Sequence, residues 1–257
     1  MKAPAIFVGH GSPMNAIEVN EFSKSWKKIG EKYKPDAILC VSAHWYTRGT
    51  YVAGQEDPKM IYDMYGFPEE LYKVNYPAKG SPEIAAKVKS ILGDKVTIAT
   101  DWGFDHGTWS VLTWMYPKAD IPVLQLSVNG TEKGGYHFEF GKKLAELRDQ
   151  NIMILGSGNV VHNLRKVNWN MDGGYTWAQE FDDYIKNAIV SRDFSKAIDP
   201  DSAGPIRKDA FPTPDHYYPL LYVLGASSDD EPLKIYNDKC LMGSMSMTSY
   251  CFGEAFK

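Results

Sequence analysis

The chain has 257 residues, a formal net charge of −4 and a hydrophobic fraction of 44%, which is ordinary for a globular protein with a buried core. No basic block occurs, which argues against a nucleic-acid partner. No apolar run approaches the roughly 18–20 residues of a membrane span, and the N-terminus lacks the apolar segment of a signal peptide. The three cysteines, Cys40, Cys240 and Cys251, are widely spaced. Together these features predict a cytoplasmic protein without disulfides.

Apolar runs and helical patterns alternate along the chain, and this alternation predicts an α/β fold. The first three elements are a buried strand at 5–8, an amphipathic helix at 20–33 and a second strand at 37–41. This order indicates a parallel pair of strands joined by a crossover helix. Further strands are expected at 51–54, 96–99, 121–128, 152–155, 233–236 and 244–252, and further helices at 81–92, 108–115, 134–149, 176–191 and 215–224.

We therefore predict a single domain over residues 1–257, with a mostly parallel central sheet flanked by helices. One long stretch, 57–76, fits no regular element and is rich in aromatic residues, among them Tyr62, Tyr65 and Tyr72. Such a stretch is either a packed surface loop or a wall of a ligand site.

Five of the six histidines lie just past an apolar run or in a turn rich in glycine or proline. His10 stands in Gly-His-Gly directly after the first strand, where glycine allows the backbone to turn sharply. In open α/β sheets, ligands bind beyond the carboxyl ends of the strands, so we expect the histidines to meet at that edge. The five are His10, His44, His106, His162 and His216. The sixth, His137, falls within a helical pattern and is interpreted as non-catalytic.

Neutral imidazole is a common ligand of zinc, iron and copper, and three protein ligands with an open position are typical of a catalytic metal site. Five histidines exceed that requirement, which leaves one or two for proton transfer. Asp215, beside His216, is either a partner that orients this ligand or simply a residue near a helix N-terminus.

Other catalytic motifs are weak or missing. Gly156-Ser157-Gly158 before a helix start is too short a pattern to indicate a phosphate site, and no GxGxxG or Walker sequence occurs. Ser12 and Ser157 do not lie in GxSxG, which argues against a serine hydrolase.

Six segments together resemble the class III extradiol ring-cleavage dioxygenases, most closely the branch of 4,5-DOPA extradiol dioxygenase-like proteins. The resemblance covers nearly the whole chain in order, and it is the combination of motifs that is specific. The segments are Gly-His-Gly-Ser-Pro at 9–13, Ser-Ala-His-Trp at 42–45, Tyr-Asp-Met-Tyr-Gly-Phe-Pro-Glu-Glu-Leu-Tyr at 62–72, Asp-His-Gly-Thr-Trp at 105–109, Gly-Ser-Gly-Asn-Val-Val-His-Asn-Leu at 156–164 and Pro-Thr-Pro-Asp-His-Tyr at 212–217.

The resemblance implies an α/β domain with a non-haem Fe(II) site that opens a catechol ring with O₂. On matching positions, His10, His44 and His216 are the expected metal ligands. His162 matches the acid/base histidine and lies close enough to the metal to be a further ligand, and His106 matches the histidine that contacts substrate or oxygen. His216 replaces the carboxylate of many class III enzymes, so the all-histidine set is also a good site for Zn(II).

The first functional hypothesis is therefore an extradiol dioxygenase acting on L-DOPA or a similar catechol. A zinc hydrolase on the same histidines and a non-catalytic binding protein of the same fold are the alternatives. We expect an aromatic wall for the substrate from Trp45, Trp109, Tyr217 and the stretch 62–72, because stacked rings add about 0.5–1.5 kcal/mol each. The sequence does not determine which catechol is bound or the oligomeric state.

Overall fold

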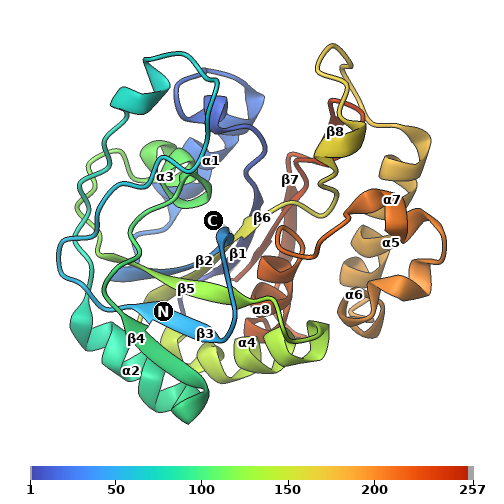
Figure 1. Ribbon diagram of the computed structural model, residues 1–257. Coiled ribbons are helices and arrows are strands. Elements are labelled where there is room, and N and C mark those ends of the chain that lie inside the picture. The colour runs from blue at the N-terminus through green and yellow to red at the C-terminus, as the bar shows by residue number, and fades with distance from the viewer. Residues whose placement is uncertain (1, 254–257) are drawn as a thin grey trace.

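An eight-stranded sheet forms the centre of the computed structural model, which describes residues 2–253 (Figure 1). Its strands, in spatial order, are β4 (Val96–Ala99), β3 (Thr50–Ala53), β5 (Val123–Asn129), β2 (Ala37–Thr47), β6 (Ile152–Gly158), β1 (Ala5–Gly9), β10 (Ser249–Phe252) and β7 (Leu233–Tyr236). A separate pair consists of β8 (Cys240–Leu241) and β9 (Met245–Ser246). The predicted α/β domain with a mostly parallel sheet is confirmed.

The helices are α1 (Glu21–Lys32), α2 (Pro82–Leu92), α3 (His106–Met115), α4 (Gly134–Arg148), α5 (Thr176–Val190), α6 (Ser195–Ile198), α7 (Ile206–Ala210) and α8 (Tyr218–Ala226). Short 3₁₀ turns lie at Pro13–Ala16, Leu71–Lys73, Gly93–Lys95, Leu164–Lys166 and Pro200–Ala203. Within residues 2–253, no helix combines the length and apolar character that a membrane crossing requires.

The four central strands, β5, β2, β6 and β1, run parallel to one another. Beyond them, β3 is antiparallel to β5, and β10 is antiparallel to both β1 and β7. The edge strand β4 is parallel to β3. The register of β10 places Phe252 opposite Ala5, so the last strand closes on the first. Because the central strands are parallel, their carboxyl ends share one edge of the sheet.

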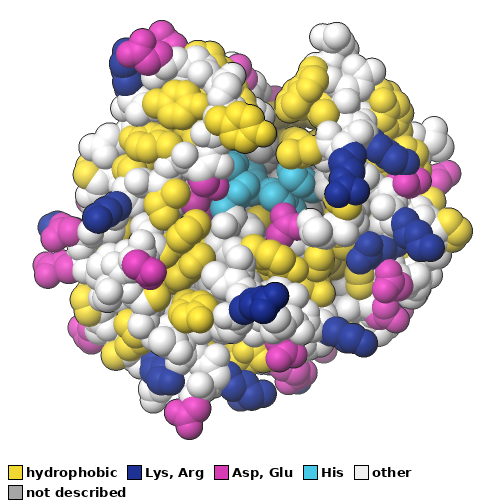
Figure 2. Space-filling view, viewed as in Figure 1, with side chains coloured by type: hydrophobic (Ala, Val, Ile, Leu, Met, Phe, Trp, Pro, Cys, Tyr) yellow, Lys and Arg dark blue, Asp and Glu magenta, His cyan; other side chains and the backbone are white. Residues whose placement is uncertain are grey.

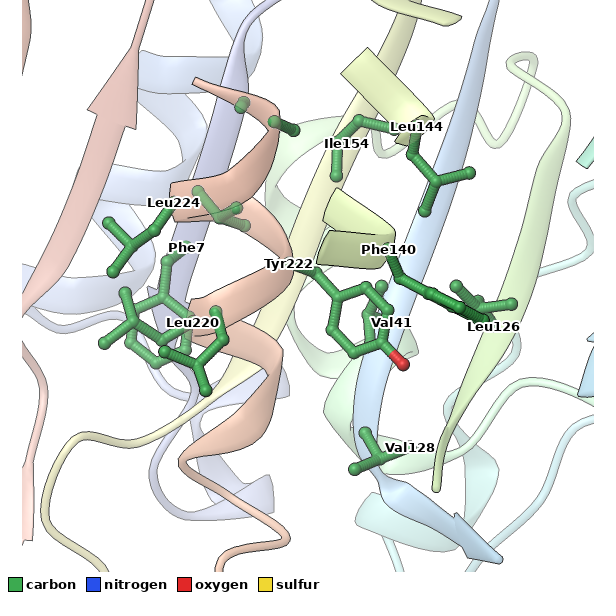
Figure 3. Close-up of a cluster of buried hydrophobic side chains, with 14 of the residues drawn as sticks. Phe7, Val41, Leu126, Val128, Phe140, Leu144, Ile154, Leu220, Tyr222 and Leu224 are labelled. Atoms are coloured by element: carbon green, nitrogen blue, oxygen red, sulfur yellow. The ribbon is translucent and has the colours of Figure 1, made fainter. Parts of the chain in front are cut away.

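Helices cover both faces of this sheet, which is why its central strands are apolar on both sides. On one face, α4 and α8 pack against each other and on β6, and Phe140, Leu144, Leu220 and Tyr222 fill the space above the strands (Figure 3). On the other face, α1 packs on α3, and Trp26 and Trp109 are fully buried in a second core.

Several predicted elements differ in their limits. The strand expected at 37–41 continues to Thr47 and so contains His44, and the strand expected at 152–155 continues to Gly158. The helix expected from Thr108 begins at His106, because the Asp105 side chain caps it by accepting from the Thr108 amide. The helix expected from Asp215 begins at Tyr218, since 214–217 form a turn and Pro219 occupies the first helical turn.

The strand expected at 244–252 is split into β9 and β10. Between them, the buried carboxylate of Asp182 accepts hydrogen bonds from Ser246 Oγ and Thr248 Oγ1 at 2.5 and 2.6 Å. These bonds hold the segment between the two strands, and Met245 at the start of β9 lines the cavity that contains the histidines.

Candidate active site

All five histidines singled out above converge at the carboxyl edge of the parallel strands. His10 follows β1, His44 lies near the end of β2, and His162 comes four residues after β6. His106 is the first residue of α3, and His216 precedes α8. The space-filling view shows the histidine side chains at the bottom of a hollow between two lobes (Figure 2). The convergence expected from the strand pattern is therefore present in the structure.

The hollow is a cavity of about 370 Å³, a size within the range of small-molecule sites. Apolar side chains from several loops surround the histidines and keep much of the cavity dry. They are Pro13, Met64, Tyr65, Phe67, Leu164, Trp169 and Met245, and Asp63 also lines the cavity.

His10 is held by a chain of hydrogen bonds that determines which of its nitrogens carries the proton. Its Nδ1 lies 3.0 Å from Ser157 Oγ, and that hydroxyl donates its only proton to the Gly107 carbonyl at 2.5 Å. Ser157 Oγ must therefore accept from His10 Nδ1–H. The lone pair of His10 is left on Nε2, which faces the other histidines.

Asp63 holds two further histidines. Its Oδ2 lies 3.0 Å from His44 Nδ1, and its Oδ1 lies 3.0 Å from His106 Nδ1 and accepts the His106 backbone N–H at 2.9 Å. A carboxylate offers only acceptors, so the His44 ring carries its proton on Nδ1 when it is neutral and presents a lone pair on Nε2. The His106 Nδ1 is close to Asp63 but makes no hydrogen bond with it, and His106 is held by its backbone N–H instead.

His216 has a carboxylate of its own. Asp215 Oδ2 lies 2.5 Å from its Nδ1, so Asp215 orients this ring while lying outside the helix that follows. The ring of His162 stacks on that of His216 with centroids 3.5 Å apart and planes at 6°. Of the five, His162 alone has no hydrogen bond or ion pair to its ring within residues 2–253, which leaves its nitrogens free to exchange a proton.

A bound cation fits this arrangement. The Nε2 atoms of His10 and His44 are 3.2 Å apart, and the bonds at both Nδ1 atoms direct two lone pairs at each other. Such a contact is repulsive unless a proton or a metal ion lies between the two nitrogens. One nitrogen each from His10, His44 and His106 lie within 4.8 Å of one another, and the His216 ring centre lies 5.2 Å from that of His10 and 4.9 Å from that of His44.

Burial keeps most of these rings neutral, the form that binds metals. Burial and the neighbouring imidazoles hold the pKa of His10 and that of His216 well below 6.5. Burial likewise lowers the pKa of His162 to about 4. Burial opposes the charged form of His44 too, but the Asp63 carboxylate outweighs it and raises the pKa of His44.

The expected aromatic wall is only partly present. Trp45, Trp109 and Tyr217 are buried in the protein core and do not line the cavity. Trp45 stacks on Trp102, and Tyr217 donates from its hydroxyl to the Ala197 carbonyl. For Trp45 the expectation erred because consecutive residues of a strand point to opposite faces of the sheet, so the neighbour of His44 points away from the cavity.

The stretch 62–72 does contribute, through Tyr65 and Phe67, and Trp169 faces it from the other side of the cavity. Sequence reasoning missed Asp63, Ser157 and Trp169 as parts of the site. The one usable signal was Asp63, a lone carboxylate in a run of apolar and aromatic residues. His137 lies outside the cavity, with its Nδ1 3.2 Å from Tyr222 Oη.

Comparison with known proteins accords with this geometry. The model of the family described as the catalytic LigB subunit of aromatic ring-opening dioxygenase matches residues 4–253. The chain belongs to the LigB family. The resemblance to class III extradiol dioxygenases is thereby confirmed, and this LigB-family chain is a ring-cleavage dioxygenase that acts on an aromatic compound with O₂.

Individual relatives of this LigB-family chain match it over nearly its whole length. It is 47% identical to a 4,5-DOPA dioxygenase extradiol of Escherichia coli (strain K12), over 98% of this chain and 95% of that one. It is 37% identical to a protein of the same name from Beta vulgaris, over 96% and 95%. The crystal structure of an uncharacterized protein from Escherichia coli K12 matches with a TM-score of 0.85 and 44% identity, covering 98% of this chain and all of the other. The family and the histidine cluster together indicate a bound metal ion.

Proposed function

We propose that the protein is an Fe(II)-dependent extradiol dioxygenase that opens the ring of L-DOPA or a similar catechol, within one catalytic domain over residues 1–257. The observation that carries this proposal is the cluster of inward-facing Nε2 atoms at the bottom of a largely apolar cavity. The names of the relatives support the substrate class.

In this proposal His10, His44 and His216 hold the metal. Each has its Nδ1 engaged by a separate oxygen group, from Ser157, Asp63 and Asp215 respectively. Such outer partners fix the tautomer and direction of a ligating imidazole. Fe(II), when bound, supplies the redox chemistry that joins O₂ to the catechol.

His162 acts as the proton acceptor for a catechol hydroxyl. Its ring is neutral at pH 7, is held by stacking on His216 and has no competing partner. His106 lies at the same cavity from the other side, with its ring centre 3.8 Å from that of His44, and contacts bound substrate or oxygen. Met64, Phe67 and Trp169 surround the ring of the substrate and exclude water.

The test is to load the purified protein with Fe(II) without oxygen and to measure O₂ uptake and absorbance with a panel of catechols. We expect a yellow ring-opened semialdehyde from L-DOPA, and no reaction with tyrosine, which lacks the second hydroxyl. Zn(II)-loaded protein is the control, because zinc has no redox chemistry. O₂ uptake without ring-opened product, with iron verified in the site, would overturn the proposal in favour of the zinc hydrolase.

Alanine at His10, His44 or His216 should abolish stoichiometric metal binding, whereas His106→Ala should retain it. Metal content by elemental analysis separates these two groups. Retention in His216→Ala together with loss in His106→Ala would reassign the ligands to the set His10, His44 and His106, whose nitrogens also lie close together. Retention in all three ligand variants would overturn the assignment.

A further inference from the structure

Asp63 lies on the segment between β3 and α2, far in sequence from both of the histidines that it contacts. Its carboxylate is shared: one oxygen faces His44 Nδ1 and the other faces His106 Nδ1, each at 3.0 Å. The rings of these two histidines lie 3.8 Å apart between centres, so a single carboxylate spans the pair. No other acid in the described chain contacts two of the five histidines.

The backbone before Asp63 is itself firmly attached to the fold. Ile61 N–H donates to the Phe104 carbonyl at 2.7 Å, and Trp109 Nε1 donates to the Ile61 carbonyl at 3.0 Å. Phe104 and Trp109 are fully buried on the sheet. These hydrogen bonds fix the backbone just before Asp63 next to α3, and they thereby fix the position from which the Asp63 side chain extends.

The residues directly after Asp63 form part of the cavity wall. Met64, Tyr65 and Phe67 all line the cavity, and the Tyr65 side chain is 92% exposed at its mouth. The same short segment thus contacts the metal-site histidines through Asp63 and the substrate space through its neighbours.

From this geometry we infer that Asp63 is a positioning residue that sets the Nδ1–H tautomer of His44, holds His106 through its backbone N–H and connects the cavity wall to the metal centre. The inference rests on the metal site of the proposed function. With Asp63 in place, the Nδ1–H of His44 has a fixed acceptor, so Nε2 faces His10 and the cavity, and a metal ion there displaces the proton between the two rings. Without it, the His44 ring can rotate or move its proton to Nε2, where a proton competes with the metal.

The first test measures affinity for Zn²⁺ alone by competition with a chelator. Asp63→Asn keeps the shape of the side chain but leaves one oxygen for two N–H donors, and its amide N–H₂ faces one of them. We expect a loss of about 10–100-fold in affinity, the usual effect of removing a group that orients a metal ligand. Asp57→Asn is the matched control, because Asp57 lies in the same segment, is exposed and pairs with Lys79.

The second test reads the tautomers directly in metal-free protein, by ¹⁵N–¹H NMR of the histidine rings. We expect an Nδ1–H at His44 in the wild type and in Asp57→Asn, and mixed tautomers at His44 in Asp63→Asn. Asp63→Glu, which restores the carboxylate on a longer arm, should recover part of the Zn²⁺ affinity.

Wild-type affinity and unchanged tautomers in Asp63→Asn would overturn the inference. So would a loss of affinity that coincides with a large fall in the melting temperature of the metal-free protein, since that result indicates a role in folding only. Neither measurement involves turnover, so a failure to cleave catechols would count against the proposed function and leave this inference standing.

Discussion

At the scale of single residues, the five cavity histidines are distinguished by what lies behind each ring. Four have an oxygen atom at Nδ1, and His162 has none among the described residues. An oxygen partner at Nδ1 fixes the orientation of the ring and leaves Nε2 to bind a metal or a ligand. A ring without such a partner can take up and release a proton. The partner at Nδ1 therefore distinguishes the histidines suited to metal binding from His162, which is suited to proton transfer.

For His162 we predict that replacement by alanine lowers turnover by about 10²–10⁴-fold, the usual contribution of a general base, with metal content unchanged. His162→Phe is the companion variant, because a phenyl ring keeps the stacking on His216 but cannot accept a proton. Steady-state rates and elemental analysis on the same samples check both. Loss of metal in the phenylalanine variant would show that His162 is chiefly a ligand.

For Ser157 we predict that replacement by alanine weakens metal binding by about 10-fold, because His10 Nδ1–H and the Gly107 carbonyl both lose their partner. Ser110→Ala is the control: its hydroxyl is also buried but has no hydrogen-bond partner within residues 2–253. Titration with Zn²⁺ measures both variants. Equal affinities would mean that packing alone orients His10.

At the scale of secondary-structure elements, the geometry of the site depends on how closely the end of a strand approaches the start of a neighbouring helix. Gly158, the last residue of β6, lies so close to the backbone before α8 that a Cβ atom there would be 2.1 Å from the His216 carbonyl oxygen. Glycine is therefore required at this position for steric reasons, and this contact sets the distance between His216 and the strands.

Gly158→Ala should separate β6 from the segment that carries His216. We expect a loss of about 1–3 kcal/mol in the free energy of unfolding, as for other overpacked sites, and weaker metal binding. Gly135→Ala on α4 is the matched control, because a Cβ there meets nothing within 4 Å and alanine favours a helix by up to about 1 kcal/mol over glycine. Urea unfolding of the metal-free variants compares them, and equal stability would contradict the steric argument.

The strands and the site residues differ in how well the sequence predicts them. Apolar runs such as the one before His10 were sufficient to predict the parallel strands, and their shared carboxyl edge was sufficient to predict the cluster of histidines. Asp63 is recognisable in the sequence as a lone carboxylate, but its contacts were not predictable, because it lies in an irregular segment whose path depends on hydrogen bonds to Phe104 and Trp109.

At the scale of the whole molecule, folding keeps several basic groups uncharged. Burial lowers the pKa of His10 and of His216 below 6.5, and it lowers the pKa of His162 to about 4 and that of His137 to about 3. An unfolded chain titrates these histidines near 6.5. Below that pH the unfolded state binds more protons than the folded state, so acid favours unfolding.

We therefore predict that the free energy of unfolding of the metal-free protein falls as the pH drops from 6.5 to 5. Two groups act in the opposite direction. His44 is buried, but Asp63 raises its pKa, and burial raises the pKa of Asp182 to about 6, so both take up protons in the folded state. The histidines whose pKa is lowered outnumber these two groups, so the net effect of acid is destabilising. Urea unfolding at several pH values checks the slope, and a rise in stability toward pH 5 would contradict it.

The pairing of the first strand with the last has a consequence for synthesis of the protein in the cell. β1, which leads into His10, lies between β6 and β10, and the Gly9 N–H donates to Ser249 Oγ, 240 residues further along the chain. A growing chain on the ribosome therefore has its first histidine long before the partners that position it. We expect the metal centre to assemble only after β10 has been synthesised, so that chains truncated before Ser249 bind less than one metal ion each, which elemental analysis checks.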